Sequence, residues 1–217
     1  MRDFINFLKA PDEHYKLPKG KLWSVIGLFL LIYLLSILIV VGNNVLQSSL
    51  PESSIKNMPA VLPLWFALTV PPLLEELSFR LWLKRNTTTI LISSVCFIWA
   101  LVSTLMPYRI YSTDHLVLRC LIALAGGCAV TFLFKKQILN AKFPVIFYAS
   151  AIVFGLMHAQ NYYDIVNVWG VVYVVLIVIT RILSGLFYGY VRIGYCFLAA
   201  LIFHIAHNLP LIAHYLQ

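Results

Sequence analysis

Long apolar runs constrain the fold of this chain more than any other feature of its sequence. Seven runs approach the ~20 residues that an α-helix needs to cross a bilayer, and 61% of the 217 residues are hydrophobic while 11% are charged. Soluble domains are about 45–50% apolar and about 25% charged. We therefore expect an integral membrane protein, with predicted spans at residues 22–42, 60–83, 89–106, 116–134, 144–159, 166–190 and 195–216.

Each span is predicted to be an α-helix, because an open strand edge would leave backbone groups unpaired in lipid. The expected fold class is all-α, a polytopic membrane bundle of about seven transmembrane helices. No internal repeat or low-complexity linker divides the chain, so residues 22–217 are interpreted as a single transmembrane domain. Residues 1–21 precede this domain as an N-terminal segment on the cytoplasmic side.

The positions of lysine and arginine predict this orientation, because cytoplasmic loops are enriched in both residues. With the N-terminus inside, only Lys56 and Arg109 fall outside. The net charge of +8 then reflects membrane topology, so the bilayer and not nucleic acid is the expected partner. The small size fits a bacterial plasma membrane, with the endoplasmic reticulum as the alternative. The predicted cytoplasmic residues are Arg2, Lys9, Lys16, Lys19, Lys21, Lys84, Arg85, Lys135, Lys136, Lys142 and Arg192.

The N-terminal segment mixes apolar and charged side chains. Phe4, Ile5, Phe7 and Leu8 lie among charged residues. One interpretation is a short amphipathic helix on the cytoplasmic membrane surface. The other is a solvated tail. The sequence favours neither.

Two adjacent acidic residues, Glu75 and Glu76, lie within the second predicted span. An ionised side chain at the bilayer centre costs roughly 2.5–3.5 kcal/mol on insertion scales, so such residues are expected to be functional. On a helix, Glu76 and Arg80 share one face and can pair, whereas Glu75 is turned roughly 100° away and can face a cavity. The alternative is that both glutamates only hold neighbouring helices together through Arg80.

Histidines and an asparagine recur in the later spans. His158 lies near the end of the fifth span, and His204, His207 and Asn208 share one face of the last span. Taken alone, His158 and His207 are interpreted as packing residues, with His207 as a site neighbour or ligand in the second place. Counted from the predicted cytoplasmic ends, Glu75 and these residues reach depths within on the order of 8 Å of one another. A carboxylate, imidazoles and an amide around enclosed water can deprotonate water, stabilise an oxyanion and protonate a leaving amine, so we predict one intramembrane cavity.

Three short patterns follow one another along the chain, each within an apolar run. They are EExxxR at Glu75, Glu76 and Arg80, FxxxH at Phe154 and His158, and HxxxN at His204 and Asn208. In this order they resemble the three motifs of the CPBP family, the CAAX prenyl proteases and bacteriocin-processing enzymes, also called the Abi family. Each pattern alone is weak, but the order and the apolar context make the combination specific. The resemblance covers about residues 62–209.

This resemblance implies a helical intramembrane endopeptidase that hydrolyses a peptide bond without an acyl-enzyme. The substrate would be a membrane-associated or small peptide or protein, and lipid-modified substrates belong to part of the family. Carried over by position, Glu75 would be the general base that activates water, assisted by His158. His204 and Asn208 would stabilise the oxyanion.

Glu76 and Arg80 would support these catalytic groups. Members of the family have also been described as metalloproteases, although this chain has no HExxH motif. A zinc ion would take its ligands, Glu75, His158 and His204, from three helices. We favour a metal-free mechanism that needs no cofactor, with zinc as the alternative.

The spacing of the motifs departs from the family pattern. Glu75 and His158 are 83 positions apart, whereas a single helical hairpin separates these motifs in many members. If residues 89–106 were the true counterpart of the second motif, Leu101 would replace its histidine and the site would be inactive. A catalytically silent scaffold, acting in immunity or regulation, is therefore the alternative function. A proton-coupled transporter is a third hypothesis, because intramembrane glutamate and histidine also serve as proton relays.

Overall fold

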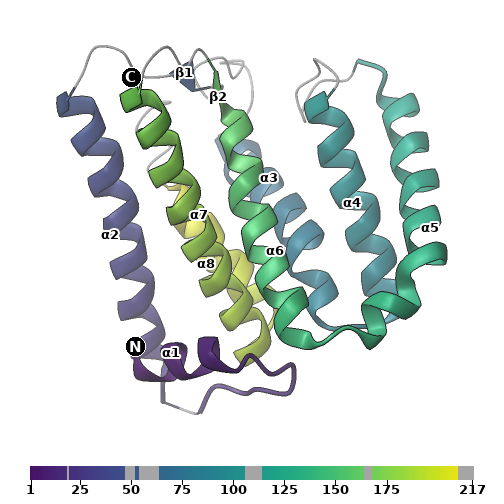
Figure 1. The fold of residues 1–217 in the computed structure, drawn as a ribbon, viewed down its shortest axis with the longest axis horizontal. Helices are drawn as coiled ribbons and strands as arrows, with labels where there is room; N and C mark the ends of the chain where they lie inside the picture. The colour runs from purple at the N-terminus through teal and green to yellow at the C-terminus, as the bar shows by residue number, and fades with distance from the viewer. Residues whose placement is uncertain (19, 47–51, 54–63, 106–113, 164–167, 210–217) are drawn as a thin grey trace.

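The predicted apolar runs form helices in the computed structural model, which describes residues 1–18, 20–46, 52–53, 64–105, 114–163 and 168–209. The long helices stand side by side, and a short N-terminal helix lies across one end of them (Figure 1). The elements in chain order are α1 (Arg2–Lys9), α2 (Leu22–Leu46), β1 (Glu52–Ser53), α3 (Leu64–Phe79), η2 (Leu81–Leu83), α4 (Thr87–Leu105), α5 (Leu116–Asn140), α6 (Phe143–Met157), η3 (His158–Asn161), β2 (Tyr162–Tyr163), α7 (Val168–Gly194) and α8 (Phe197–Asn208).

The helical fold class is confirmed, but the predicted count of seven spans is not. Within the described residues, five helical segments are long and apolar enough to cross a membrane: α2, α4, α5, α6 extended by η3, and α7. The other two predicted spans form the 16-residue α3 and the 12-residue α8. The predicted span ends at 60–63, 106, 166–167 and 210–216 lie outside the described residues.

Helix α7 is the centre of the bundle and packs against α2, α6 and α8, while α3 packs against α4 and α8. Helices α4 and α5 form a close pair. A Cβ atom on Gly127 of α5 would lie 2.4 Å from Cγ2 of Val95 and 2.9 Å from its backbone, so only glycine allows this approach. At the end opposite α1, the two-residue strands β1 and β2 pair antiparallel, with Glu52 opposite Tyr163.

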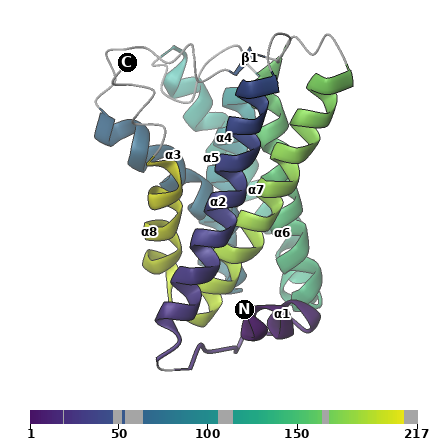
Figure 2. The ribbon, with the colours of Figure 1, turned by 90° about the vertical axis from the view of Figure 1, so that its left-hand side faces the viewer.

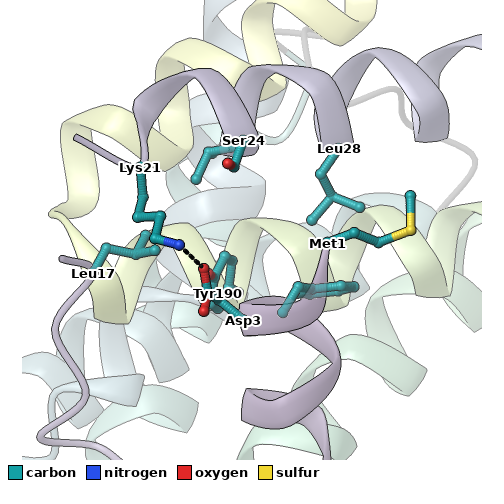
Figure 3. A pocket seen from close by; sticks show the side chains of 9 residues that line it. Met1, Asp3, Leu17, Lys21, Ser24, Leu28 and Tyr190 are labelled. Carbon is teal, nitrogen blue, oxygen red and sulfur yellow. Dashed lines mark ion pairs between the residues drawn. The ribbon is translucent and has the colours of Figure 1, made fainter. Parts of the chain in front are cut away.

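Helix α1 is part of the bundle and not a solvated tail (Figure 2). Its buried Phe4 and Phe7 side chains both contact the ring of Tyr190 on α7, with ring centroids 5.1 and 5.2 Å apart. An ion pair of 3.0 Å between Asp3 and Lys21 connects α1 to the start of α2, beside a void of only about 10 Å³ (Figure 3). That volume is about the size of one water molecule. The helical alternative for this segment therefore matches the structure, and its contact with a membrane surface stays a prediction.

Arg85 joins three segments that are distant in the sequence. Its guanidinium donates two hydrogen bonds to the carboxylate of Glu13, one of them from Nε at 2.8 Å. Its Nη1 donates to the carbonyl oxygens of Leu139 and Ala141, at 3.1 and 2.6 Å. These bonds connect the segment after α1, the α3–α4 connection and the α5–α6 connection. The hydrogen bonds from Arg85 lower the pKa of Glu13 below its ordinary value of about 4.5.

Replacing Glu13 with glutamine should lower the thermal unfolding midpoint of the purified protein by about 2–4 °C at neutral pH. This is the shift expected for the loss of about 1 kcal/mol from a partly exposed ion pair. Because the folded-state pKa is lowered, the stabilisation is present above about pH 4.5 and is lost as the pH falls through the lowered pKa. Differential scanning fluorimetry of both proteins across pH 3–8 would measure it.

The matched control is Asp12→Asn, which removes the neighbouring carboxylate. Asp12 accepts a hydrogen bond from the backbone N–H of His14 and forms no ion pair with a described residue. Its replacement should shift the midpoint less than the replacement of Glu13. Equal midpoints for wild type and Glu13→Gln at pH 7 would contradict the assigned role of Arg85.

Candidate active site

Three helices bring the predicted site residues together. Helix α3 carries Glu75 and Glu76 near its C-terminal end, Arg80 directly follows the helix, and His204 lies within α8. His158 is the first residue after α6, where the backbone tightens into η3. Helix α7 packs behind these residues, because it contacts α6, η3 and α8. The two short helices α3 and α8 therefore supply three of the five ionisable side chains of this site, Glu75, Glu76 and His204.

The carboxylate of Glu75 lies between two imidazole rings. Its Oε2 is 3.4 Å from Nε2 of His204 and 3.9 Å from Nε2 of His158. The Glu75 side chain is 30% exposed, that of His158 15% and that of His204 2%. Glu75 is thus the accessible member of a cluster whose other members are enclosed by the bundle.

The hydrogen bonds of the two histidines determine which nitrogen faces Glu75. Nδ1 of His158 is 2.8 Å from the carbonyl oxygen of Phe154, and a carbonyl oxygen can only accept. Nδ1 of His204 is 2.9 Å from Oε1 of Glu76, which accepts as a carboxylate. In the neutral imidazole a protonated Nδ1 leaves Nε2 as an acceptor. While both rings are neutral, both Nε2 atoms therefore present a lone pair toward Glu75, and the three groups form a set of bases around one point.

Glu76 is completely buried and links α3 to α8. Besides the bond from His204, its Oε1 is 3.7 Å from Nη1 of Arg80 one turn along the helix, and both side chains are at most 1% exposed. Its second oxygen, Oε2, has no hydrogen-bond partner among the described residues, nor do the two Nη atoms of Arg80. Burying a carboxylate is costly unless a cation and hydrogen-bond donors compensate it. Arg80 and His204 supply this compensation.

Aromatic rings enclose the guanidinium of Arg80. Its Cζ lies 3.8 Å from the ring centroid of Phe154 and 5.5 Å from that of Tyr188. Cation–π contacts of this kind favour the charged group most strongly where water is excluded. Gly185 leaves room for this arrangement, since a Cβ atom there would lie 3.1 Å from Nη2 of Arg80. Tyr188 also stacks on His204, with centroids 4.6 Å apart and ring planes 17° from parallel.

The remaining predicted residues are less closely connected. Asn208 is the last residue of α8, one turn beyond His204 and half-buried, and its side chain forms no hydrogen bond with a described residue. His207 is buried with its ring edge against Tyr33 at 5.6 Å, as its interpretation as a packing residue requires. Leu101 on α4 lines a cleft between α3, α4, α5 and α6. The histidine of the second motif that lies beside Glu75 is His158.

The three residues considered as alternative zinc ligands lie within this cluster. Among the described residues, however, no three His, Cys, Asp or Glu side chains are arranged to hold a metal ion. The arrangement that the structure gives them is that of a carboxylate facing two imidazole acceptors. We therefore derive no step through a metal ion.

Two site residues escape the sequence analysis. Tyr188 belongs to the apolar stretch SGLFYG, and only its spacing of three from Gly185 indicates that both residues face the same side of α7. Arg181 lies two helical turns before Tyr188, is half-buried, and interacts electrostatically with Glu75 and His158. Helical periodicity places Arg181 and Tyr188 on one face, but their distance in sequence from the three motifs conceals their proximity to the site.

Replacing Arg80 with methionine should destabilise the protein strongly. The substitution roughly keeps the volume but leaves the buried Glu76 without its cation, and breaking a buried ion pair costs about 3–5 kcal/mol. Thermal and SDS-induced unfolding would measure the loss. The double variant with Glu76→Gln added should recover part of it, because the uncompensated carboxylate is then absent. A single variant as stable as wild type would contradict the proposed compensation.

Comparison with known proteins identifies no relative of this chain. No family model, no curated protein and no solved structure matches the chain. The resemblance carried by the three motifs therefore stays a prediction. What the structure adds is geometry, because five of the seven motif residues form one connected cluster of ion pairs and hydrogen bonds around Glu75, Glu76 and His204.

Proposed function

We propose that this protein is an intramembrane endopeptidase of the CPBP type, which hydrolyses a peptide bond of a membrane-associated or small peptide with water activated by Glu75. The observation that carries the proposal is the position of the Glu75 carboxylate, 3.4 and 3.9 Å from the Nε2 atoms of His204 and His158. Three bases around one partly exposed point are suited to removing a proton from water. A purely structural ion pair would not need two additional imidazole acceptors.

The proposed reaction begins when Glu75 takes a proton from water and the resulting hydroxide attacks the carbonyl carbon of the scissile bond. The proton then passes from Glu75 to Nε2 of His204, which makes this ring an imidazolium. The carboxylate of Glu76 at Nδ1 stabilises that cation. The protonated Nε2 of His204 can now donate a hydrogen bond to the oxyanion. It returns the proton to the leaving nitrogen as the C–N bond breaks.

This sequence of steps refines the role of His204. The family resemblance makes His204 an oxyanion stabiliser, yet a neutral ring whose Nδ1 donates to Glu76 has no proton at Nε2 to donate. Proton transfer from Glu75 removes the conflict, because it supplies the donor in the step in which the oxyanion forms. Asn208, one turn further along α8, is the second donor in this proposal.

The distribution of charge supports a cytoplasmic orientation for the end of the bundle that carries α1. Arg85, Lys84 and Lys142 belong to connections at this end, next to the N-terminal segment (Figure 1). Positively charged loops are retained on the cytoplasmic side of membranes. In this orientation Glu75 lies beside His158, which follows the end of α6 remote from the cytoplasmic connection at Lys142. A bacterial plasma membrane is the proposed location.

Replacing Glu75 with glutamine should lower the rate of peptide cleavage by about 10²–10⁴-fold, which is the usual contribution of a general base. The glutamine keeps the size of the side chain but cannot take a proton. Cleavage of a membrane-associated peptide library by wild type and variant, purified in detergent and followed by mass spectrometry, would measure the change. Asp12→Asn, a carboxylate loss far from the site, should leave the rate unchanged.

Three outcomes of this experiment separate the alternatives. Cleavage by wild type that a metal chelator abolishes and zinc restores would contradict the metal-free mechanism. A folded wild type that cuts nothing, while Glu75→Gln keeps the cellular phenotype, would favour a silent scaffold. Solute flux that follows a proton gradient and is lost in Glu75→Gln would favour a transporter.

Replacing Asn208 with alanine should lower kcat by about 10²–10³-fold, as the loss of an oxyanion donor does. The thermal midpoint should stay that of wild type, because the Asn208 side chain forms no hydrogen bond with the described part of the chain. Leu209→Ala, at the neighbouring exposed position, is the matched control. An unchanged kcat for Asn208→Ala would remove this residue from the site.

A further inference from the structure

A cleft lies between α3, α4, α5 and α6. Its volume is about 420 Å³, within the roughly 300–1,000 Å³ range of pockets that hold small ligands. Phe79, Phe97 and Val153 are among its apolar walls. The edge-to-face contact between Phe79 and Phe154, with centroids 5.5 Å apart, separates it from the cluster around Glu75. The cleft is therefore a distinct site.

The helix pairing explains why this cleft stays open. Helix α5 packs on α4, α4 packs on α3, and α6 packs on α7, while α5 and α6 are joined mainly by their short connection. The close contact of Gly127 with Val95 draws α5 against α4. Figure 1 shows the resulting separation between the α4–α5 pair and α6. Val153 on α6 consequently remains 38% exposed.

The walls of the cleft offer few free polar groups to a ligand. Three of its four serines already donate their hydroxyl hydrogen to backbone carbonyl oxygens: Ser78 to Leu74, Ser93 to Leu77, and Ser150 to Phe79. A polar or peptidic ligand would leave its own donors and acceptors unpaired there, which is costly in an apolar environment. An engineered apolar cavity of about 150 Å³ binds benzene, and this cleft is large enough for a hydrocarbon chain.

One end of the cleft reaches the basic end of the bundle. Trp82 and Ile138 line this end, and they lie two and three positions from Lys84 and Lys135. Arg85, next to Lys84, donates hydrogen bonds to the carbonyl oxygens of Leu139 and Ala141, and these bonds connect the α3–α4 connection to the end of α5. Arg85 is itself neutralised by Glu13, whereas neither lysine forms an ion pair with a described residue. An apolar cleft next to the ammonium groups of Lys84 and Lys135 is complementary to an anionic lipid.

We propose that this cleft binds one anionic phospholipid, with an acyl chain between α4 and α6 and the headgroup phosphate against Lys84 and Lys135. The proposal does not depend on proteolysis. The lipid would fill the space beside Phe79 and connect the α4–α5 pair to α6. It would therefore act as a structural ligand that stabilises the fold next to the site.

The test uses the full-length protein, delipidated in detergent and titrated with palmitoyl-oleoyl phosphatidylglycerol. Native mass spectrometry should show one retained lipid per protein. Lys135→Gln should raise the apparent dissociation constant of the lipid at least fivefold. Lys136→Gln, at the neighbouring and more exposed position, should change it less than twofold. Val153→Trp should fill the cleft and abolish retention, while Ile152→Trp, equally lipid-facing but not part of the wall, should not.

Several results would overturn the proposal. If phosphatidylcholine bound as tightly as phosphatidylglycerol and Lys135→Gln had no effect, the proposed contact between the anionic headgroup and the lysines would be wrong. Retention that survives Val153→Trp in a variant with a wild-type thermal midpoint would place the lipid elsewhere. A cleft that binds an S-farnesyl peptide and leaves phosphatidylglycerol unbound would assign it to substrate. None of these results depends on whether Glu75 supports cleavage.

Discussion

The buried carboxylate of Glu76 is the constraint on which the centre of this structure depends. A charge without access to water must be compensated by protein groups, and here the compensation comes from Arg80, directly after α3, and from His204 on α8. Arg80 in turn requires the aromatic ring of Phe154 and the space left by Gly185. Four helices, α3, α6, α7 and α8, are thus brought into one arrangement by a single negative charge.

The same arrangement gives the two glutamates different tasks. Glu76 is enclosed and orients His204 through Nδ1, while Glu75, its neighbour in sequence, is turned toward the accessible side and faces the opposite ring nitrogen. One imidazole therefore connects an inner carboxylate with an outer one. Adjacent residues on a helix point about 100° apart, so an acidic pair can place one member in the packing and the other at the reacting point without any special backbone geometry.

The sequence predicts the parts of the structure that follow from local periodicity. The long apolar runs become helices, Glu76 and Arg80 approach each other one turn apart, and His207 packs among aromatic rings. The predicted spans at 60–83 and 195–216 are not confirmed, because the described helices α3 and α8 are 16 and 12 residues long and the outer ends of both spans lie outside the described residues. Tyr188 and the docking of Phe4 and Phe7 escape prediction, since their contacts join residues far apart in the chain.

The position of α1 has a consequence for the order in which the chain assembles. Helix α1 is synthesised first, but the surface on which it rests includes Phe147 of α6 and Tyr190 of α7. The nearby Glu13 accepts hydrogen bonds from Arg85, which also donates to carbonyl groups at the end of α5 and directly after it. The N-terminal segment can therefore dock only after α6, α7 and the connection after α5 are in place. Its docking is a late step of biogenesis that closes the basic end of the bundle.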